Sequence, residues 1–198
     1  CANGRSRVPE EIWPGNADGW HSRKRSTLGA TMTMTAPGIP MLFQGQEFLE
    51  DGHFAAEDPL DWEKSKRNGG IINMYRRLIQ LRRNFDNNTR GLRGDHVNVH
   101  HVNNNDKVIA YHRWDQGGKG DDVVIVANFS GRTFRDYKVG VPKKGMWWVR
   151  FNGDWKGYYN DFGAIDVQDV EGYDGGIDGM GFHANVNLGP YSAVILSQ

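Results

Sequence analysis

The chain has 198 residues, and its 24 Lys and Arg residues balance its 24 Asp and Glu residues. A zero formal net charge gives no electrostatic reason to expect nucleic acid or an anionic membrane as a partner. No apolar run approaches the roughly 20 residues that a membrane-spanning helix needs.

The start of the chain and its cysteine content bear on its origin. Cys1 is the only cysteine, so an internal disulfide is excluded, which favours a reducing compartment and a cytoplasmic location. The chain opens without an initiator Met and without the apolar segment of a signal peptide. We therefore expect a fragment whose natural beginning lies upstream.

The first 88 residues have the pattern of an α/β segment. A helix is expected over about residues 20–34, with Asp18 as its N-cap. The short apolar run at 39–43 suits a parallel strand buried on both faces. A second helix is predicted from apolar residues at three- and four-residue spacings, namely Ile71, Met74, Tyr75, Leu78, Leu81 and Phe85. One strand cannot form a sheet, so this half requires strands from elsewhere.

From about Thr89 the hydrophobic period changes to two. Short runs rich in Val, Ile and aromatic residues are separated by turn-forming clusters of Gly, Asn, Asp and Pro. About seven such runs favour an antiparallel β-sandwich. We expect strands at 96–102, 107–114, 123–129, 134–141, 146–151, 181–188 and 191–197.

One segment carries a family resemblance. Residues 36–48, APGIPMLFQGQEF, resemble the eighth-strand signature of the α-amylase superfamily (glycoside hydrolase family 13) at Gly38, Pro40, Gly45 and Glu47. Residues 57–62, EDPLDW, resemble the loop after that strand in members such as 1,4-α-glucan branching enzymes. Residues 2–9 resemble the stretch that follows the family's His-Asp pair after strand seven.

This resemblance implies an α+β fragment: the end of a (β/α)8 barrel (helix, strand eight, helix) at 1–88, followed by a C-terminal β-sandwich domain at 89–198. The family is retaining, with catalytic carboxyl groups about 5–5.5 Å apart. All three of its catalytic carboxylates lie on strands four, five and seven, upstream of Cys1. The resemblance thus implies an inactive fragment of an enzyme acting on α-1,4-glucans such as glycogen or starch. Branching and hydrolysis both remain open.

The same resemblance implies which residues border the glucan cleft. Active sites of such barrels lie at the C-terminal ends of the strands. Asn3, Gly4 and Arg5 would follow strand seven there, and Gln46 and Glu47 would follow strand eight. A purely structural hydrogen bond is the competing interpretation for Glu47.

Aromatic residues suggest a different function, a non-catalytic carbohydrate-binding or structural β-sandwich module. Trp155, Tyr158 and Tyr159 lie in a Gly-rich loop and could stack on sugar rings, although core packing is the alternative. Trp147 and Trp148 are adjacent in a strand, so at most one of them faces a given side.

Other clusters favour structural interpretations. The acidic residues of 57–61 are typical of turns, and the loop at 174–179 lacks the spacing of a calcium loop. Histidines 96, 100, 101 and 112 indicate an exposed polar face more than a metal site. We therefore predict no metal and no cofactor. The incomplete barrel predicts self-association through its exposed edge, remodelling, or packing on the sandwich.

Overall fold

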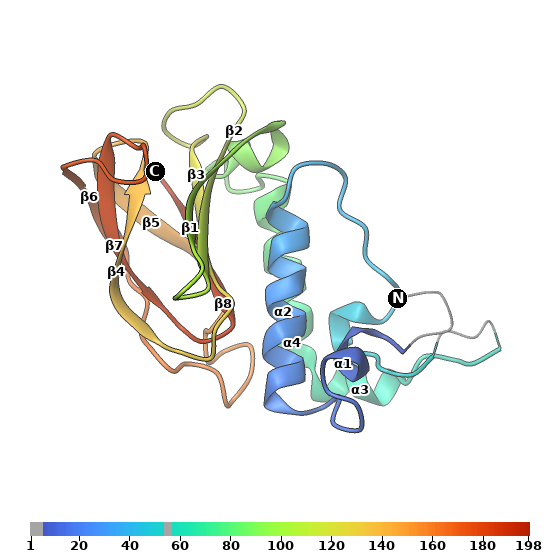
Figure 1. Cartoon of the computed structure of the whole chain (residues 1–198). Helices are drawn as coiled ribbons and strands as arrows, with labels where there is room; N and C mark the ends of the chain where they lie inside the picture. The colour runs from blue at the N-terminus through green and yellow to red at the C-terminus, as the bar shows by residue number, and fades with distance from the viewer. Residues whose placement is uncertain (1–5, 54–56) are drawn as a thin grey trace.

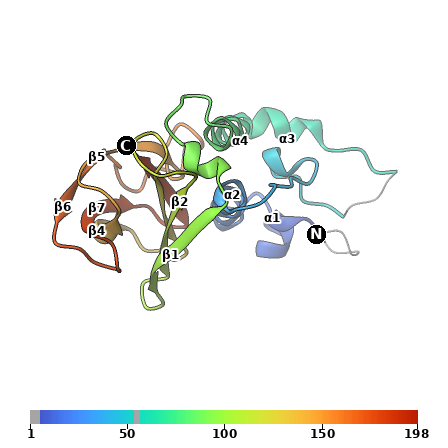
Figure 2. The same cartoon turned by 90° about the horizontal axis from the view of Figure 1, so that it is seen from above.

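A computed structural model describes residues 6–53 and 57–198. Helices from the first half of the chain form a layer beside a curled β-sheet built by the second half (Figure 1). The helical elements are α1 (Val8–Ile12), α2 (Trp20–Thr35), η1 (Gln46–Phe48), α3 (Trp62–Arg67), α4 (Gly69–Arg82) and η2 (Arg90–Arg93). Seen from above, the two long helices, α2 and α4, are viewed along their axes and lie between the sheet and the shorter helices α1 and α3 (Figure 2).

The sheet has eight antiparallel strands in the order β1-β2-β3-β8-β5-β6-β7-β4. All seven predicted strands are present, and a short strand, β6, was not predicted. Its five residues, VEGYD, do not alternate regularly between apolar and polar side chains, so the sequence carries no two-residue hydrophobic period there. The strands are β1 (His96–Asn103), β2 (Val108–Trp114), β3 (Val123–Asn128), β4 (Phe134–Val141), β5 (Gly145–Asn152), β6 (Val170–Asp174), β7 (Phe182–Leu188) and β8 (Ser192–Ser197).

Two hydrophobic cores lie on opposite faces of the central strands. Along β3, Val123 and Ile125 join a core shared with α2 and α4, which we call the helix-side core. Val124 and Val126 point the other way, into a core enclosed by the curled sheet, which we call the inner core. This division follows from the two-residue period of a strand. The central strands are therefore buried on both faces, one of them by the helices.

The curl brings the two edge strands, β1 and β4, close together. A bulge between Val99 and His101 interrupts the register of β1. His100 Nε2 lies 3.0 Å from the Gly140 carbonyl, and His101 Nε2 lies 3.1 Å from the Tyr137 hydroxyl. The prediction of an exposed polar histidine face is therefore wrong for these two residues, because they close the seam between the sheet edges. It is also wrong for His112, which is buried with its Nε2 2.8 Å from Asp122 Oδ1, whereas His96 is exposed.

The two long helices differ in how they are buried. α4 has a single apolar stripe of Ile71, Met74, Tyr75, Leu78 and Leu81. Phe85 does not belong to it, because the helix ends at Arg82 and Asn84 adopts a left-handed conformation, leaving Phe85 55% exposed. α2 is buried on several sides, and its threonines satisfy their hydroxyls on carbonyls one turn back. It begins at Trp20 as predicted, although Gly19 and not Asp18 is its N-cap.

The predicted strand at residues 39–43 is not formed. The segment is extended between α2 and η1 but pairs with no strand among the described residues. Ile39 is 98% exposed and Met41 is 81% exposed. A parallel strand requires neighbouring strands on its edges, and the sheet of this chain lies on the other side of the helices.

Buried polar contacts join the helix layer to the sheet. Lys24 Nζ donates to Asp154 Oδ1 at 2.6 Å, and both side chains are fully buried. Arg113 on β2 donates to the carbonyl oxygen of Thr35 at the end of α2. At the start of α4, a Cβ on Gly70 would lie 2.2 Å from the Tyr158 carbonyl oxygen. The helices and the curled sheet therefore share a close interface. We call the curled sheet the sandwich, because its opposing strands enclose the inner core.

Within the described parts of the chain, no helix combines the length and apolar character needed to cross a membrane.

Candidate functional site

The turn at residues 43–50 carries two predicted rim residues, Gln46 and Glu47. Gly45 opens the turn with a φ of 83°, and a Cβ there would lie 2.7 Å from the Glu50 Cβ. Leu49 closes it, also in the left-handed region. A non-glycine residue pays for that conformation, so the surrounding contacts must hold the turn in place.

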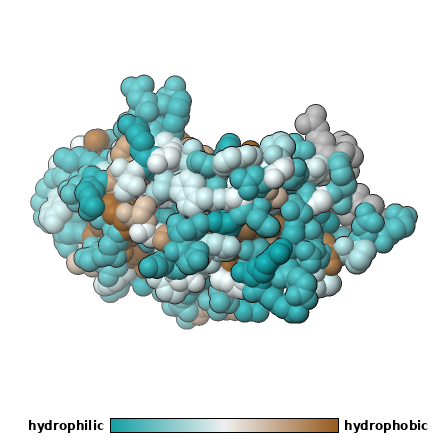
Figure 3. Space-filling view, turned by 90° about the horizontal axis from the view of Figure 1, so that it is seen from below, coloured by the Kyte–Doolittle hydropathy of each residue, from teal (hydrophilic) through white to brown (hydrophobic). Residues whose placement is uncertain are grey.

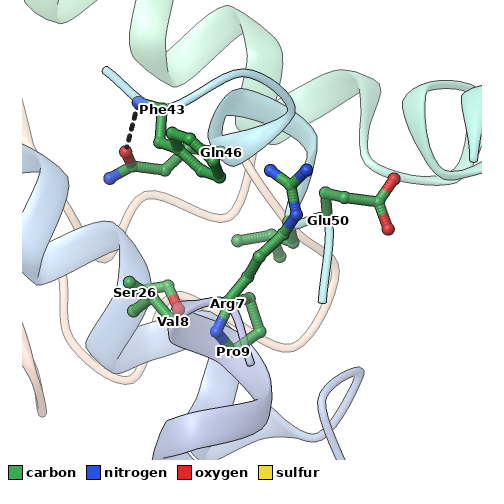
Figure 4. A pocket seen from close by; sticks show the side chains of 8 residues that line it. Arg7, Val8, Pro9, Ser26, Phe43, Gln46 and Glu50 are labelled. Atoms are coloured by element: carbon green, nitrogen blue, oxygen red, sulfur yellow. Dashed lines mark hydrogen bonds between the residues drawn. The ribbon is translucent and has the colours of Figure 1, made fainter. Parts of the chain in front are cut away.

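Gln46 and Glu47 have different surroundings within this turn. Gln46 Oε1 accepts a hydrogen bond from the Phe43 amide at 3.2 Å, so its side chain supports the turn itself (Figure 4). Glu47 is partly exposed in η1. Both lie near the buried Tyr75 phenol, whose pKa is raised by burial, lowered by Gln46 and raised further by the charge of Glu47. Tyr75 is therefore neutral beneath the turn.

A buried network anchors the far end of the turn. Glu50 accepts from the backbone amides of Asp51 and Asp61, the latter at 2.7 Å. Lys64 pairs with Asp51 and lies 3.5 Å from Glu50. Asp61 in turn caps α3 by accepting from the Glu63 amide. The expected role of Asp61 as a turn residue is consistent with this cap, and Glu50 was missed because nothing in its local sequence marks it as buried.

Arg7 was also missed, and it contacts the turn from the N-terminal side of α1. Its side chain is only 6% exposed, its guanidinium stacks on the Phe43 ring, and it donates to the Gln44 carbonyl. Arg7 lines a pocket together with Gln46 and Glu50, and Figure 4 shows the Glu50 carboxylate pointing away from it. That cavity measures about 20 Å³, too small for a sugar ring. Within residues 6–53 and 57–198, Arg7 has no carboxylate partner.

The predicted rim residues Asn3, Gly4 and Arg5 lie outside the described residues.

The aromatic loop between β5 and β6 separates its three predicted residues. Trp155 is 55% exposed, whereas Tyr158 is buried and stacks on Phe151. Burial raises the pKa of Tyr158 to about 12. The Tyr159 ring is covered by the Arg23 guanidinium, 4.1 Å from the ring centroid. Only Trp155 of this trio presents a largely open face.

Trp147 is fully buried in the inner core, whereas Trp148 is partly exposed. The two adjacent tryptophans thus face opposite sides, as the strand geometry requires. No group of three or more His, Cys, Asp or Glu side chains in the part of the chain that the structure describes is arranged to hold a metal ion.

A family model described as the alpha amylase C-terminal all-beta domain matches residues 99–198. The match begins inside β1 and covers the whole sandwich from there.

Curated relatives include 1,4-alpha-glucan branching enzymes GlgB. The protein of Deinococcus radiodurans is 30% identical over 169 residues, covering 83% of this chain and 24% of the relative. That of Paramagnetospirillum magneticum is 26% identical over 178 residues, covering 83% and 22%. The chain thus spans about a quarter of the length of the curated relatives it matches.

Solved structures show the same fold at lower identity. A pullulanase from Anoxybacillus sp. LM18-11, complexed with maltotetraose, superposes with a TM-score of 0.67 at 20% identity, covering all of this chain and 27% of that protein. An alpha-amylase from H.orenii superposes with a TM-score of 0.57 at 17% identity, covering 89% and 36%. With the family match over half of its residues, the chain belongs to the family of alpha-amylase C-terminal all-beta domains and resembles the C-terminal portion of glycoside hydrolase family 13 enzymes.

Proposed function

We propose that this chain is the C-terminal portion of an enzyme that acts on α-1,4-glucan with retention, and that its catalytic carboxylates are supplied by polypeptide upstream of Cys1. The observation that carries the proposal is the apolar segment at 39–43, which lies between α2 and η1 and has no strand partner within residues 6–53 and 57–198. In a (β/α)8 barrel, a buried strand occupies this place between consecutive helices.

Exposure supports this assignment. Ile39 and Met41 project into solvent although their neighbours in the segment are apolar. Flanking parallel strands would pair with the backbone of the segment and remove both side chains from water. In the proposal, residues 1–88 complete a barrel and residues 89–198 form the sandwich that packs behind it.

The barrel assignment gives the 43–50 turn a role. It follows the segment at its C-terminal end, which is the active-site end of a barrel strand. Glu47 and Gln46 would then border the glucan cleft, together with Asn3, Gly4 and Arg5 from the preceding strand. The Gly45 turn would hold Gln46 and Glu47 in place, and within the turn Gln46 is already engaged with the Phe43 amide.

Branching is the favoured reaction within this class, because the curated relatives named above are branching enzymes. A branching enzyme resolves its covalent glucosyl intermediate with a sugar 6-hydroxyl, whereas a hydrolase uses water. A cytoplasmic location, where soluble glycogen-like substrate is made, fits the single cysteine.

The test begins with the protein isolated from its natural source. Its intact mass should exceed that of the 198-residue chain, and incubation with amylose should create α-1,6 branch points, measured by debranching and chain-length analysis. In that protein Glu47→Gln should lower turnover without changing the unfolding temperature, while Glu63→Gln on exposed α3 should change neither. A natural protein that leaves amylose unaltered, neither branched nor cleaved, would refute the proposal.

Self-association is a separate consequence of the unpaired segment. The isolated chain can cover residues 39–43 by pairing them with a second copy. Sedimentation should then show a dimer that Met41→Lys dissociates, and a monomer at all concentrations would refute this pairing.

A further inference from the structure

Trp155 is an aromatic platform whose orientation is fixed. Its edge-to-face partner is Tyr158, with ring centroids 5.0 Å apart and planes at 88°. Gly157 lies directly against the indole, and a Cβ there would be 2.3 Å from the Trp155 ring. The indole is therefore held before any ligand arrives, which lowers the entropic cost of binding to its exposed face.

A polar trough begins at this platform. Trp155 borders a hollow of about 640 Å³ over β5 and the segment 166–169. A second hollow of about 400 Å³ shares Asp166, Gln168 and Asp169 with the first. The two hollows therefore adjoin along this segment, and we call them together the trough. Beyond the shared residues, it continues along Arg135, Asp136, Val170, Asn185 and Asn187.

The walls of the trough are held by hydrogen bonds. Asp169 Oδ1 accepts from the Val149 amide at 2.7 Å. Asn187 donates to the Asp166 carbonyl and accepts from the Asp136 amide. In the described parts of the chain these bonds use one oxygen of the Asp169 carboxylate, which leaves its other oxygen for a ligand.

The chemistry of the lining selects a neutral, hydroxyl-rich ligand. Two guanidinium groups, Arg135 and Arg150, stand beside the carboxylates of Asp136, Asp166 and Asp169. This mixed charge disfavours a polyanion or a polycation, while amides, carboxylates and guanidinium groups all exchange hydrogen bonds with hydroxyls. The Trp155 face suits the apolar side of a pyranose ring.

We propose that the trough from Trp155 to Asn187 binds a segment of α-1,4-linked glucan, with one glucose ring stacked on Trp155 and its neighbours hydrogen-bonded along residues 166–169. The choice of α-1,4-glucan rests on the proposed function, whereas the neutral polysaccharide class rests on the trough alone. The face of the molecule seen from below is mostly hydrophilic, with small and separate hydrophobic areas (Figure 3).

Affinity electrophoresis of the 198-residue chain tests the proposal. Gels containing glycogen should retard the chain, and dextran, an α-1,6-linked glucan, should retard it less. Trp155→Ala should raise the dissociation constant for glycogen about tenfold or more, which is the loss of affinity typical of a central aromatic contact. The matched control is Trp62→Ala, which removes an equally exposed tryptophan from the helix layer and should leave retardation unchanged.

A second variant separates binding from folding. Gln168→Ala removes an exposed amide of the trough without altering the platform and should weaken retardation, with thermal unfolding unchanged. Absence of retardation in the unsubstituted chain would overturn the proposal, as would equal weakening by Trp62→Ala. Equal retardation by dextran would overturn the choice of α-1,4-glucan. Failure of the proposed function would give a different result: the natural protein would leave amylose unaltered, while glycogen would still retard the 198-residue chain.

Discussion

The sandwich and the helix layer differ in how completely this chain covers them. Strands β3 and β8 are buried on both faces by the helices on one side and the opposite half of the curled sheet on the other. The segment 39–43, in contrast, leaves Ile39 and Met41 in solvent. The comparison teaches that the central strands of the sheet are covered on both faces within this chain, whereas the helix layer is covered on the face toward the sheet and leaves apolar side chains of the segment 39–43 in solvent.

The largest expected effect on stability concerns the buried ion pair between Lys24 and Asp154, which joins α2 to the loop after β5. Lys24→Met leaves Asp154 buried without its cation, and we expect a loss of about 3–5 kcal/mol of unfolding free energy. Urea denaturation measures it. Adding Asp154→Asn should recover part of the loss, because it removes the unpaired charge. Equal stability of the single variant and the unsubstituted chain would show that the pair does not hold the two regions together.

A glycine pair tests the same interface sterically. Gly70→Ala places a methyl group against the Tyr158 carbonyl and should cost about 1–3 kcal/mol. Gly29→Ala on the exposed side of α2 meets open space and should stabilise by about 0.5–1 kcal/mol, because Gly is a poor helix former. Thermal unfolding distinguishes them, and a destabilising Gly29→Ala would contradict the assigned exposure.

Acid should act on the sandwich seam. The pKa of His100 is lowered, mainly because the ring is buried. The carbonyls of Asn98 and Gly140 and the Asp178 carboxylate oppose this shift, and the nearby His112 adds to it. The unfolded chain then binds a proton at higher pH than the folded chain, so stability should fall as pH drops below about 6.5.

His100→Gln should flatten this pH dependence between about pH 5 and 7, measured by urea denaturation across that range. His53→Gln, at an exposed position of the helix layer, is the control and should leave the slope unchanged. An identical slope in the His100 variant would place the acid sensitivity outside the seam.

The smallest effect on stability is expected in the exposed segment 39–43. At concentrations where the isolated chain is monomeric, Met41→Lys should change its unfolding free energy by less than about 0.5 kcal/mol, because the side chain is then in solvent. The same substitution in the natural protein should be strongly destabilising if flanking strands bury residue 41. A large effect in the monomeric isolated chain would show that this segment is already covered.

Much of this fold followed from the pattern of the sequence. The alternation within β3 and the three- and four-residue spacing within α4 are local properties, and both elements occur where these patterns predict them. Strand β6 escaped prediction because it is short and half-exposed. The strand at 39–43 was predicted wrongly because its apolar composition reports burial in a sheet, and composition cannot say whether that sheet lies in the same chain.

The candidate sites divide in the same way. The family resemblance marked Gln46 and Glu47, and the Gly-rich composition of its loop marked Trp155. The sequence could not show that Tyr158 lies against Trp155 or that Arg7 reaches the Gln44 carbonyl, because those contacts join residues that only folding brings together. The sequence by itself determined the two long helices, most strands and the family, but not the short helices α1 and α3. The tertiary structure decided which faces are covered, because burial depends on neighbours distant in the chain.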